Sequence, residues 1–193
     1  MESITLDIPQ ARTWSHDQLY EFCMANPTLA IERDAQGIIH IMSPAGGLSS
    51  IYSGQLFFAV ESWNRQSGLG KTFDSSGGFL LPGGAMLAPD VAWVQLETWN
   101  SLTKKDKEQF PPICPDFIIE VKSRTDRLNT LKQKMATWME NGCSLGWLID
   151  PTEQKAYVYS QGSSIEREVS FESELTGKDL MPGFRYLLSD LFA

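Results

Sequence analysis

The sequence predicts a mixed α/β domain in which a central β-sheet is flanked by helices. Two stretches, residues 48–65 and 125–141, have the apolar spacing of amphipathic helices. Short apolar segments typical of buried strands surround them, among them FIIEV (117–121) and LGWLID (145–150). The chain has 193 residues, which is enough for one domain with a substantial hydrophobic core.

The N-terminal quarter of the chain is predicted to form a helix followed by a β-hairpin. The helix covers residues 14–25, with Ser15 as its candidate N-cap. The segment AIERDAQGIIHIM (30–42) has the pattern of two strands that turn near Gly37. After the loop SPAGG comes the 48–65 helix, whose apolar stripe consists of Leu48, Tyr52, Leu56, Ala59, Val60 and Trp63.

The middle of the chain alternates strand patterns with polar connections. KTFDSSGGFLLPGG (71–84) indicates two short strands around a Ser-Gly turn, and MLAPDVAWV (86–94) indicates one further strand. A polar, lysine-rich connection follows over residues 97–112. The 125–141 helix ends at Asn141-Gly142, a favourable C-terminal signal. Its apolar face consists of Leu128, Leu131, Met135 and Trp138.

Composition and charge limit the classes of function that this chain is expected to have. The net charge is −8, whereas domains that bind nucleic acid usually carry a basic face. Basic residues are nevertheless clustered locally, at Lys122, Arg124, Arg127, Lys132 and Lys134. No apolar run reaches the ~20 residues that span a bilayer, and the N-terminus lacks the pattern of a secretory signal. Three scattered cysteines suit a reducing compartment, so we expect a cytoplasmic protein without a membrane segment.

A charged pair in the buried strand pattern at 117–121 is the strongest functional signal. Strand alternation places Glu120 and Lys122 on the same face, with Cα atoms about 7 Å apart. Charges are rarely buried unless they are paired or bind a metal. Asp90 could complete a divalent metal site if its strand pairs with the strand of Glu120. Asp116 lies about 13 Å from Glu120 along the strand, too far to share one ion.

Other interpretations of these residues remain open on the sequence alone. A Glu-x-Lys pair on a strand is most often an exposed, salt-linked face. Asp116 has the position of a strand-start residue, and Asp150, which precedes Pro151, that of a turn residue. The chain contains neither a phosphate-binding Gly-x-x-x-x-Gly-Lys-Ser/Thr string nor a Gly-x-Ser-x-Gly string, which argues against P-loop and serine-hydrolase chemistry.

The order of helix, three strands, helix and strand, with Asp90, Glu120 and Lys122, resembles the PD-(D/E)XK nuclease superfamily. Across nearly the whole chain the sequence also resembles the Uma-type endonucleases, long described as a domain of unknown function. The resemblance implies one restriction-endonuclease-like domain over residues 1–193. We expect an N-terminal extension at 1–47, a nuclease core at 48–150, and C-terminal strands with a closing segment at 151–193. The matching stretches are IIHIMSP, APDVAWV, PDFIIEVKS, LKQKMATWMENG, LGWLIDP and LMPGFRYLLSDLF.

The resemblance also implies roles for individual residues. Asp90 and Glu120 match the carboxylates that ligate Mg²⁺, with the carbonyl of Val121 as a third ligand; Mn²⁺ is expected to substitute. Lys122 matches the superfamily lysine. Many relatives instead carry a lysine on the following helix, where Lys134 stands in this chain. Either lysine could act on the attacking water or stabilise the negative charge that develops in the reaction.

A further acid usually comes from the N-terminal part in such proteins, and Glu32 matches it. The competing acid, Glu61, lies about 140° around the helix from the apolar stripe and should face solvent. This chain departs from the pattern of the family at Ser49 and Ser50, which stand where relatives often carry a histidine.

These features predict a Mg²⁺-dependent endonuclease that hydrolyses phosphodiester bonds in DNA. The alternative is a non-catalytic member of the same fold that serves as an interaction or assembly module. The net negative charge favours the alternative slightly, whereas the set of Asp90, Glu120 and Lys122 favours the nuclease. The resemblance also implies that the protein could form a homodimer, because many nucleases of this fold do.

Overall fold

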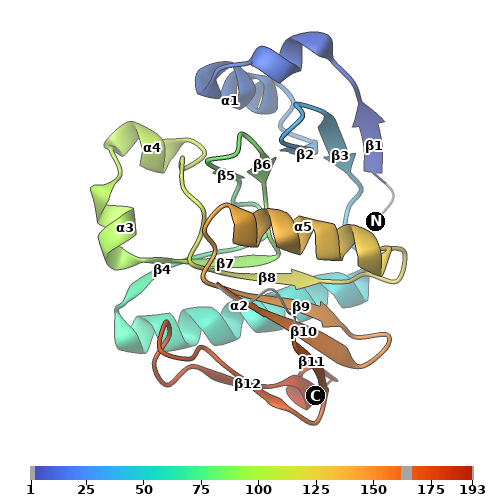
Figure 1. The fold of residues 1–193 in the computed structure, drawn as a ribbon, viewed down its shortest axis with the longest axis vertical. Helices are drawn as coiled ribbons and strands as arrows, with labels where there is room; N and C mark the ends of the chain where they lie inside the picture. Colours follow the sequence, from blue (N-terminus) through green and yellow to red (C-terminus); the bar gives the residue numbers. More distant parts are fainter. Residues whose placement is uncertain (1–2, 162–166, 193) are drawn as a thin grey trace.

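The computed structural model describes residues 3–161 and 167–192 of the chain. It contains two larger β-sheets and two long helices (Figure 1). A six-stranded sheet has the order β11-β10-β9-β8-β7-β4, and a five-stranded sheet has the order β1-β3-β2-β6-β5. The two long helices are α2 (Gly47–Ser67) and α5 (Leu128–Glu140), and in Figure 1 α5 lies between the two sheets. This arrangement confirms the predicted mixed α/β class.

The six-stranded sheet is mixed. Its strands β8 and β9 are parallel, and the chain crosses from one to the other through α5, whereas the other neighbours are antiparallel. A parallel pair requires such a long crossover connection. The strands of this sheet are β4 (Gly70–Phe73), β7 (Val91–Gln95), β8 (Phe117–Val121), β9 (Leu145–Asp150), β10 (Lys155–Ser160) and β11 (Arg167–Ser170).

The two long helices cover opposite faces of the six-stranded sheet. Phe117 and Ile119 of β8 share a core with residues of α2, while Ile118 shares a second core with Met135 and Trp138 of α5. The alternation predicted for this strand is therefore confirmed. Because every residue of β8 is buried, any charge on the strand must find a partner inside the protein.

The five-stranded sheet is antiparallel and packs on α1 (His16–Ala25). Ser15 caps this helix in a capping box with Gln18, as its position predicted. The predicted hairpin is also present, and Gly37 adopts a positive φ of 85° at its turn. The strands are β1 (Ser3–Leu6), β2 (Ala30–Arg33), β3 (Ile39–Met42), β5 (Phe79–Leu80) and β6 (Met86–Leu87), and a 3-10 helix, η1, spans Pro9–Thr13.

Two predicted strand segments divide between the sheets. MLAPDVAWV was expected to be one strand, but it forms β6 in one sheet and β7 in the other, with residues 88–90 as the connection. The two strands of KTFDSSGGFLLPGG, β4 and β5, likewise belong to different sheets. Pairing between Arg33 of β2 and Met86 of β6 joins the N-terminal segment to the middle of the chain. The polar connection after β7 holds two short helices, α3 (Leu96–Ser101) and α4 (Lys104–Glu108).

The C-terminal segment closes the core on the side of α2. It contains β12 (Glu174–Thr176), β13 (Arg185–Leu187) and a 3-10 helix, η2 (Leu188–Phe192). Phe184 stacks on Trp147 of β9 with ring centroids 5.6 Å apart. None of the helices in the described part of the chain is long and apolar enough to cross a membrane.

Candidate functional site

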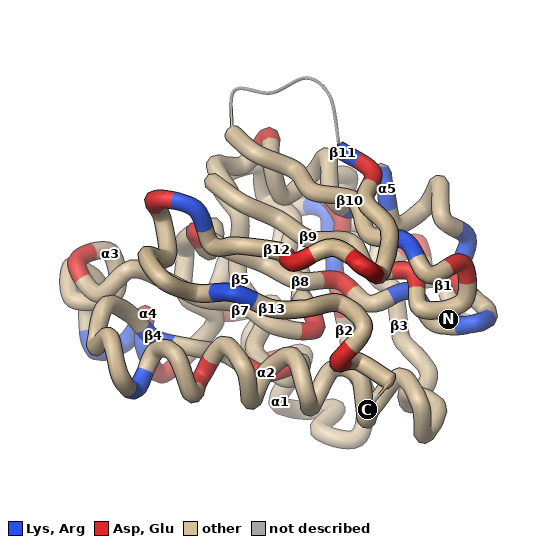
Figure 2. The backbone as a smooth tube through the Cα atoms, turned by 90° about the horizontal axis from the view of Figure 1, so that it is seen from below, with Lys and Arg blue, Asp and Glu red and all other residues tan. Residues whose placement is uncertain are grey.

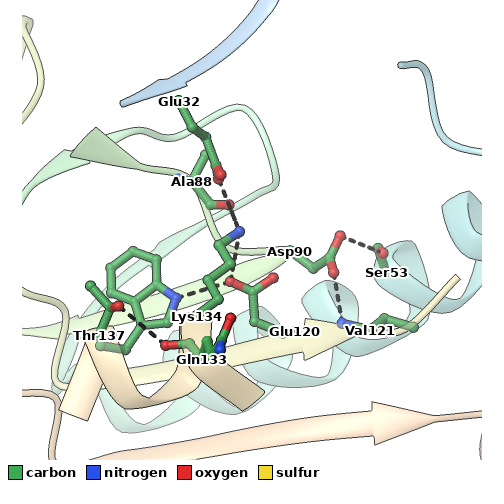
Figure 3. A network of polar contacts seen from close by, with 10 residues as sticks. Glu32, Ser53, Ala88, Asp90, Glu120, Val121, Gln133, Lys134 and Thr137 are labelled. Carbon is green, nitrogen blue, oxygen red and sulfur yellow. Dashed lines mark hydrogen bonds and ion pairs between the residues drawn. The ribbon is translucent and has the colours of Figure 1, made fainter. Parts of the chain in front are cut away.

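Asp90 and Glu120 meet where β7 begins and β8 ends. β7 and β8 are antiparallel, with Val91 opposite Ile119, so Asp90 directly precedes the paired region opposite Glu120. Asp90 is therefore not inside a strand, as was expected, but in the connection from β6. Its carboxylate accepts the N–H of Val121 at 2.7 Å and the hydroxyl of Ser53 at 3.1 Å (Figure 3).

Lys134 of α5 connects this pair to the five-stranded sheet. Its Nζ lies 2.9 Å from Oε1 of Glu120 and 2.9 Å from Oε1 of Glu32 (Figure 3). It also donates to the carbonyl of Ala88 at 3.0 Å, while the N–H of Ala88 donates to Glu32 at 3.0 Å. Glu32, Asp90, Glu120 and Lys134, which lie on separate elements, are thus brought to one place.

The carboxylate of Glu120 is held from a second side by an indole. Nε1 of Trp138, one turn after Lys134 on α5, donates to Oε1 of Glu120 at 2.9 Å. Glu120 is only 4 % exposed. Both contacts engage Oε1, so Oε2 has no hydrogen bond from another described residue and is free to bind a further group.

The electrostatics of the site favour an added cation. Burial raises the pKa of Glu120 to about 7. Lys134 lowers this pKa, but the negative charges of Asp90 and Glu32 raise it and offset part of the effect of Lys134. Burial also raises the pKa of Asp90. Although burial alone would lower the pKa of Lys134, the charges of Glu120 and Glu32 raise it overall. Three carboxylates share one ammonium group, and a divalent cation would offset the remaining negative charge.

The carbonyl of Val121 points toward Asp90. In a trans peptide the C=O and the following N–H point in opposite directions. The N–H of Lys122 donates to Ile149 of β9 at 2.8 Å, so the carbonyl of Val121 points to the other side of β8. The N–H of Val121 points to the same side, where it donates to the carboxylate of Asp90. The oxygens of Asp90, Glu120 and the carbonyl of Val121 therefore lie on the same side of β8, and whether they bind a metal ion stays a prediction.

This set of oxygen ligands suits a hard cation. Within residues 3–161 and 167–192, no group of three or more His, Cys, Asp or Glu side chains is arranged to hold a metal ion. Glu32, the third acid nearby, is occupied by Lys134. Mg²⁺ prefers oxygen ligands and commonly binds one or two carboxylates while keeping several waters. The residues present fit Mg²⁺ on these grounds, whereas a structural zinc site would need more nitrogen or sulfur ligands.

Lys122, the other candidate lysine, pairs elsewhere. β8 ends at Val121, and Nζ of Lys122 lies 3.3 Å from Oδ2 of Asp150 at the end of β9. Oδ1 of Asp150 accepts the N–H groups of Thr152 and Glu153, which agrees with the predicted turn role. The structure thus separates the two lysines that the sequence left as alternatives, because Lys134 contacts Glu120 and Lys122 contacts Asp150.

We expect Lys122→Met to destabilise the protein by about 3 kcal/mol, because it leaves a buried carboxylate without its cation. Asp150 is 1 % exposed. Urea unfolding of Lys122→Met, Asp150→Leu and the double variant would measure the coupling between the two side chains. The double variant should be less destabilised than the sum of the single variants. Additive losses would show that the pair contributes no coupling energy.

The acids that the sequence analysis set aside lie away from Lys134. Glu61 binds Arg65 at 2.7 Å on the surface of α2. Asp116 accepts the N–H of Gln95 at 2.8 Å, as expected of a residue at a strand start.

Sequence reasoning missed several polar neighbours of the site. Ser53 was not singled out, yet it donates to Asp90, and its polarity on a largely apolar helix was the available signal. His40 stands directly opposite Glu32 in the β2–β3 pairing, and its Nε2 lies 3.1 Å from Oδ2 of Asp34. The i to i+8 spacing of Glu32 and His40 across the predicted hairpin could have placed them side by side. Ser49 and Ser50, found where a histidine was expected, line the same cleft.

The site opens into a cleft between the two sheets. The cleft has a volume of about 1630 Å³, well above the ~300–1,000 Å³ of pockets for small ligands. One wall is the face of β2 and β3 that carries Glu32 and His40, and the other includes Glu120 and α5. A cleft of this size suits a segment of a polymer.

Comparison with protein families agrees with this geometry. A family model named Uma2 and described as "Putative restriction endonuclease" matches residues 16–189, most of the chain. The chain belongs to the Uma2 family. The resemblance to this family that was noted in the sequence is thereby confirmed. No curated protein matches the chain.

A solved structure supports the fold of this Uma2 member. It is described as a putative nuclease belonging to DUF820 from Anabaena variabilis ATCC 29413. The alignment has a TM-score of 0.75 at 18 % sequence identity and covers 93 % of this chain and 97 % of that chain. The two proteins therefore share the restriction-endonuclease-like fold over nearly their whole lengths.

Proposed function

We propose that this Uma2 protein is a Mg²⁺-dependent endonuclease that hydrolyses phosphodiester bonds in DNA. One observation carries the proposal: Asp90 and Glu120 meet at adjacent strand ends, with the ammonium group of Lys134 in contact with Glu120. The family match supports nuclease chemistry, and the cleft can accept a polymer.

In the proposed mechanism, Asp90, Glu120 and the carbonyl of Val121 would hold the metal ion. Bound Mg²⁺ would polarise the scissile phosphate and lower the pKa of a bound water. Lys134 stabilises the negative charge that develops on the phosphate. Because its pKa is raised, Lys134 keeps its proton at neutral pH and acts through charge, not as a proton acceptor. Ser53 and Trp138 orient the two carboxylates, and Glu32 positions Lys134.

Calorimetry and a plasmid assay together test this function. We expect the protein to bind Mg²⁺ and Mn²⁺ in calorimetric titrations, because the site carries surplus negative charge. It should convert supercoiled plasmid to relaxed or linear DNA with either metal, and a chelator should stop the reaction. Absence of both cation binding and cutting would refute the proposal.

A non-catalytic role in assembly is the second candidate. The net charge of −8 and the serines at positions 49 and 50 favour it. Cation binding separates the two candidates, since a scaffold does not require a metal site. That the protein forms a homodimer and that it is located in the cytoplasm both remain predictions.

A further inference from the structure

Most positively charged side chains in this protein already have partners. The chain has 16 lysines and arginines, and all lie in the described ranges. Twelve contact an acid, another polar group or an aromatic ring. The side chains of the remaining four make no hydrogen bond, ion pair or ring contact within those ranges: Lys71, Arg124, Arg127 and Arg167. In the view of Figure 2, acidic and basic positions are interspersed along the backbone.

Two of these four unpaired cations lie in the short loop between β8 and α5. The loop follows Val121 directly and leads into the helix that carries Lys134. Its backbone is ordered by hydrogen bonds, because Asp126 accepts the N–H of Ser123 at 2.8 Å and donates its own N–H to the carbonyl of Ser123 at 3.2 Å. Both arginine side chains are exposed. The loop therefore presents two free guanidinium groups on a fixed backbone.

Arg127 lies on the same side of α5 as Lys134. They are seven positions apart, which corresponds to nearly two helical turns, or about 10 Å along the axis. Both line the cleft. A strand of DNA advances about 3.4 Å per nucleotide, so Arg127 is placed for a phosphate about three nucleotides from the one beside Lys134.

The C-terminal end of α5 does not favour the binding of a polyanion. Glu140 lines the cleft there, and Oδ1 of Asn141 accepts the N–H of Gly83 at 2.6 Å. This contact joins the helix end to the β5–β6 turn, so the cleft is bordered there by protein and by an acid. Positive charge along the cleft side of α5 is therefore concentrated toward its N-terminal end.

We propose that bound DNA leaves the metal site across the N-terminal end of α5, with Arg124 and Arg127 binding phosphates on one side of the scissile bond. This inference rests on the proposed function and adds the direction of the bound strand. Guanidinium groups form paired, charge-assisted hydrogen bonds with phosphate oxygens. Because phosphate contacts carry no sequence information directly, these arginines should support binding of any sequence equally.

Salt-dependent binding of a fluorescent DNA duplex of arbitrary sequence tests the inference. Arg124→Gln and Arg127→Gln, made in a Glu120→Ala background to prevent cutting, should each weaken binding several-fold. Each should also reduce the slope of log K against log salt by about 1, and the double variant by about 2. The matched controls are Lys71→Gln and Arg167→Gln, which remove the other unpaired cations and should leave the slope unchanged.

Cleavage kinetics with the natural Glu120 provide a second measurement. The two arginine variants should raise KM several-fold and leave kcat unchanged, because both side chains act at a distance from the scissile phosphate. Arginine variants that match the controls would overturn the inference, while cutting by the unmodified protein would still support the nuclease. Failure of the unmodified protein to bind DNA would overturn the inference as well. Binding without cutting, but with the expected changes in slope, would support the inference and refute only the nuclease.

Discussion

Asp90→Ala and Glu120→Ala are each expected to abolish Mg²⁺-dependent cutting of DNA. Each variant removes one of the two carboxylates proposed to hold the ion, and only the carbonyl of Val121 and the other acid would remain. A metal ion contributes several kcal/mol of transition-state stabilisation. Since 1.36 kcal/mol corresponds to a factor of ten, the expected loss is ~10³-fold or more in rate.

Plasmid cutting with saturating Mg²⁺ measures this loss, and calorimetry should show weakened cation binding in both variants. Glu61→Ala is the matched control, because it removes a carboxylate that pairs with Arg65 on the helix surface. This control should cut like the unmodified protein. Circular dichroism would establish that each variant is folded. Unchanged cutting by either Asp90→Ala or Glu120→Ala would refute the metal-site assignment.

Lys134→Met is expected to reduce kcat by about 10²–10³-fold, the usual effect of removing one preorganised group that stabilises transition-state charge. Methionine keeps much of the length of the side chain but removes the ammonium group that contacts Glu120 and Glu32. Single-turnover cleavage at saturating DNA and Mg²⁺ measures the effect on the chemical step. Cation affinity should persist or rise, because the change removes a positive charge from the metal site.

The same assay on Lys122→Met provides the comparison, since this variant removes the other candidate lysine. It should lose stability yet retain cutting at temperatures where it is folded, because Lys122 pairs with Asp150 and not with Glu120. The opposite pattern, with Lys122→Met inactive and Lys134→Met active, would assign the catalytic role to Lys122.

Local patterns predicted the elements that hold the site. The alternation in FIIEV placed Glu120 on one face with Ile118, and the structure has this arrangement and packs that face on α5. The helices at 48–65 and 125–141 correspond to α2 and α5 within a few residues. These predictions succeed because side-chain periodicity in a strand or helix reflects which face is buried. The pairing of β7 with β8 then brings Asp90 opposite the end of β8.

Other features depend on long-range pairing and were not predictable from local patterns. The segment MLAPDVAWV has an apolar pattern on both sides of Pro89, and nothing local shows that β6 pairs with β2 in a different sheet. The partner of Lys122 depends on where β9 ends beside β8. Alternation gave the correct face for Lys122, but it could not identify which acid on that face would be in reach.

The contacts among Glu32, Ala88 and Lys134 make the position of the proposed catalytic lysine depend on completed folding. One carboxylate from the N-terminal hairpin binds both the backbone before β7 and the ammonium group of α5. A nascent or partly unfolded chain, with its first hairpin detached, would leave this lysine unanchored. For the proposed nuclease, such a chain is expected to be inactive toward nucleic acid until the hairpin has docked.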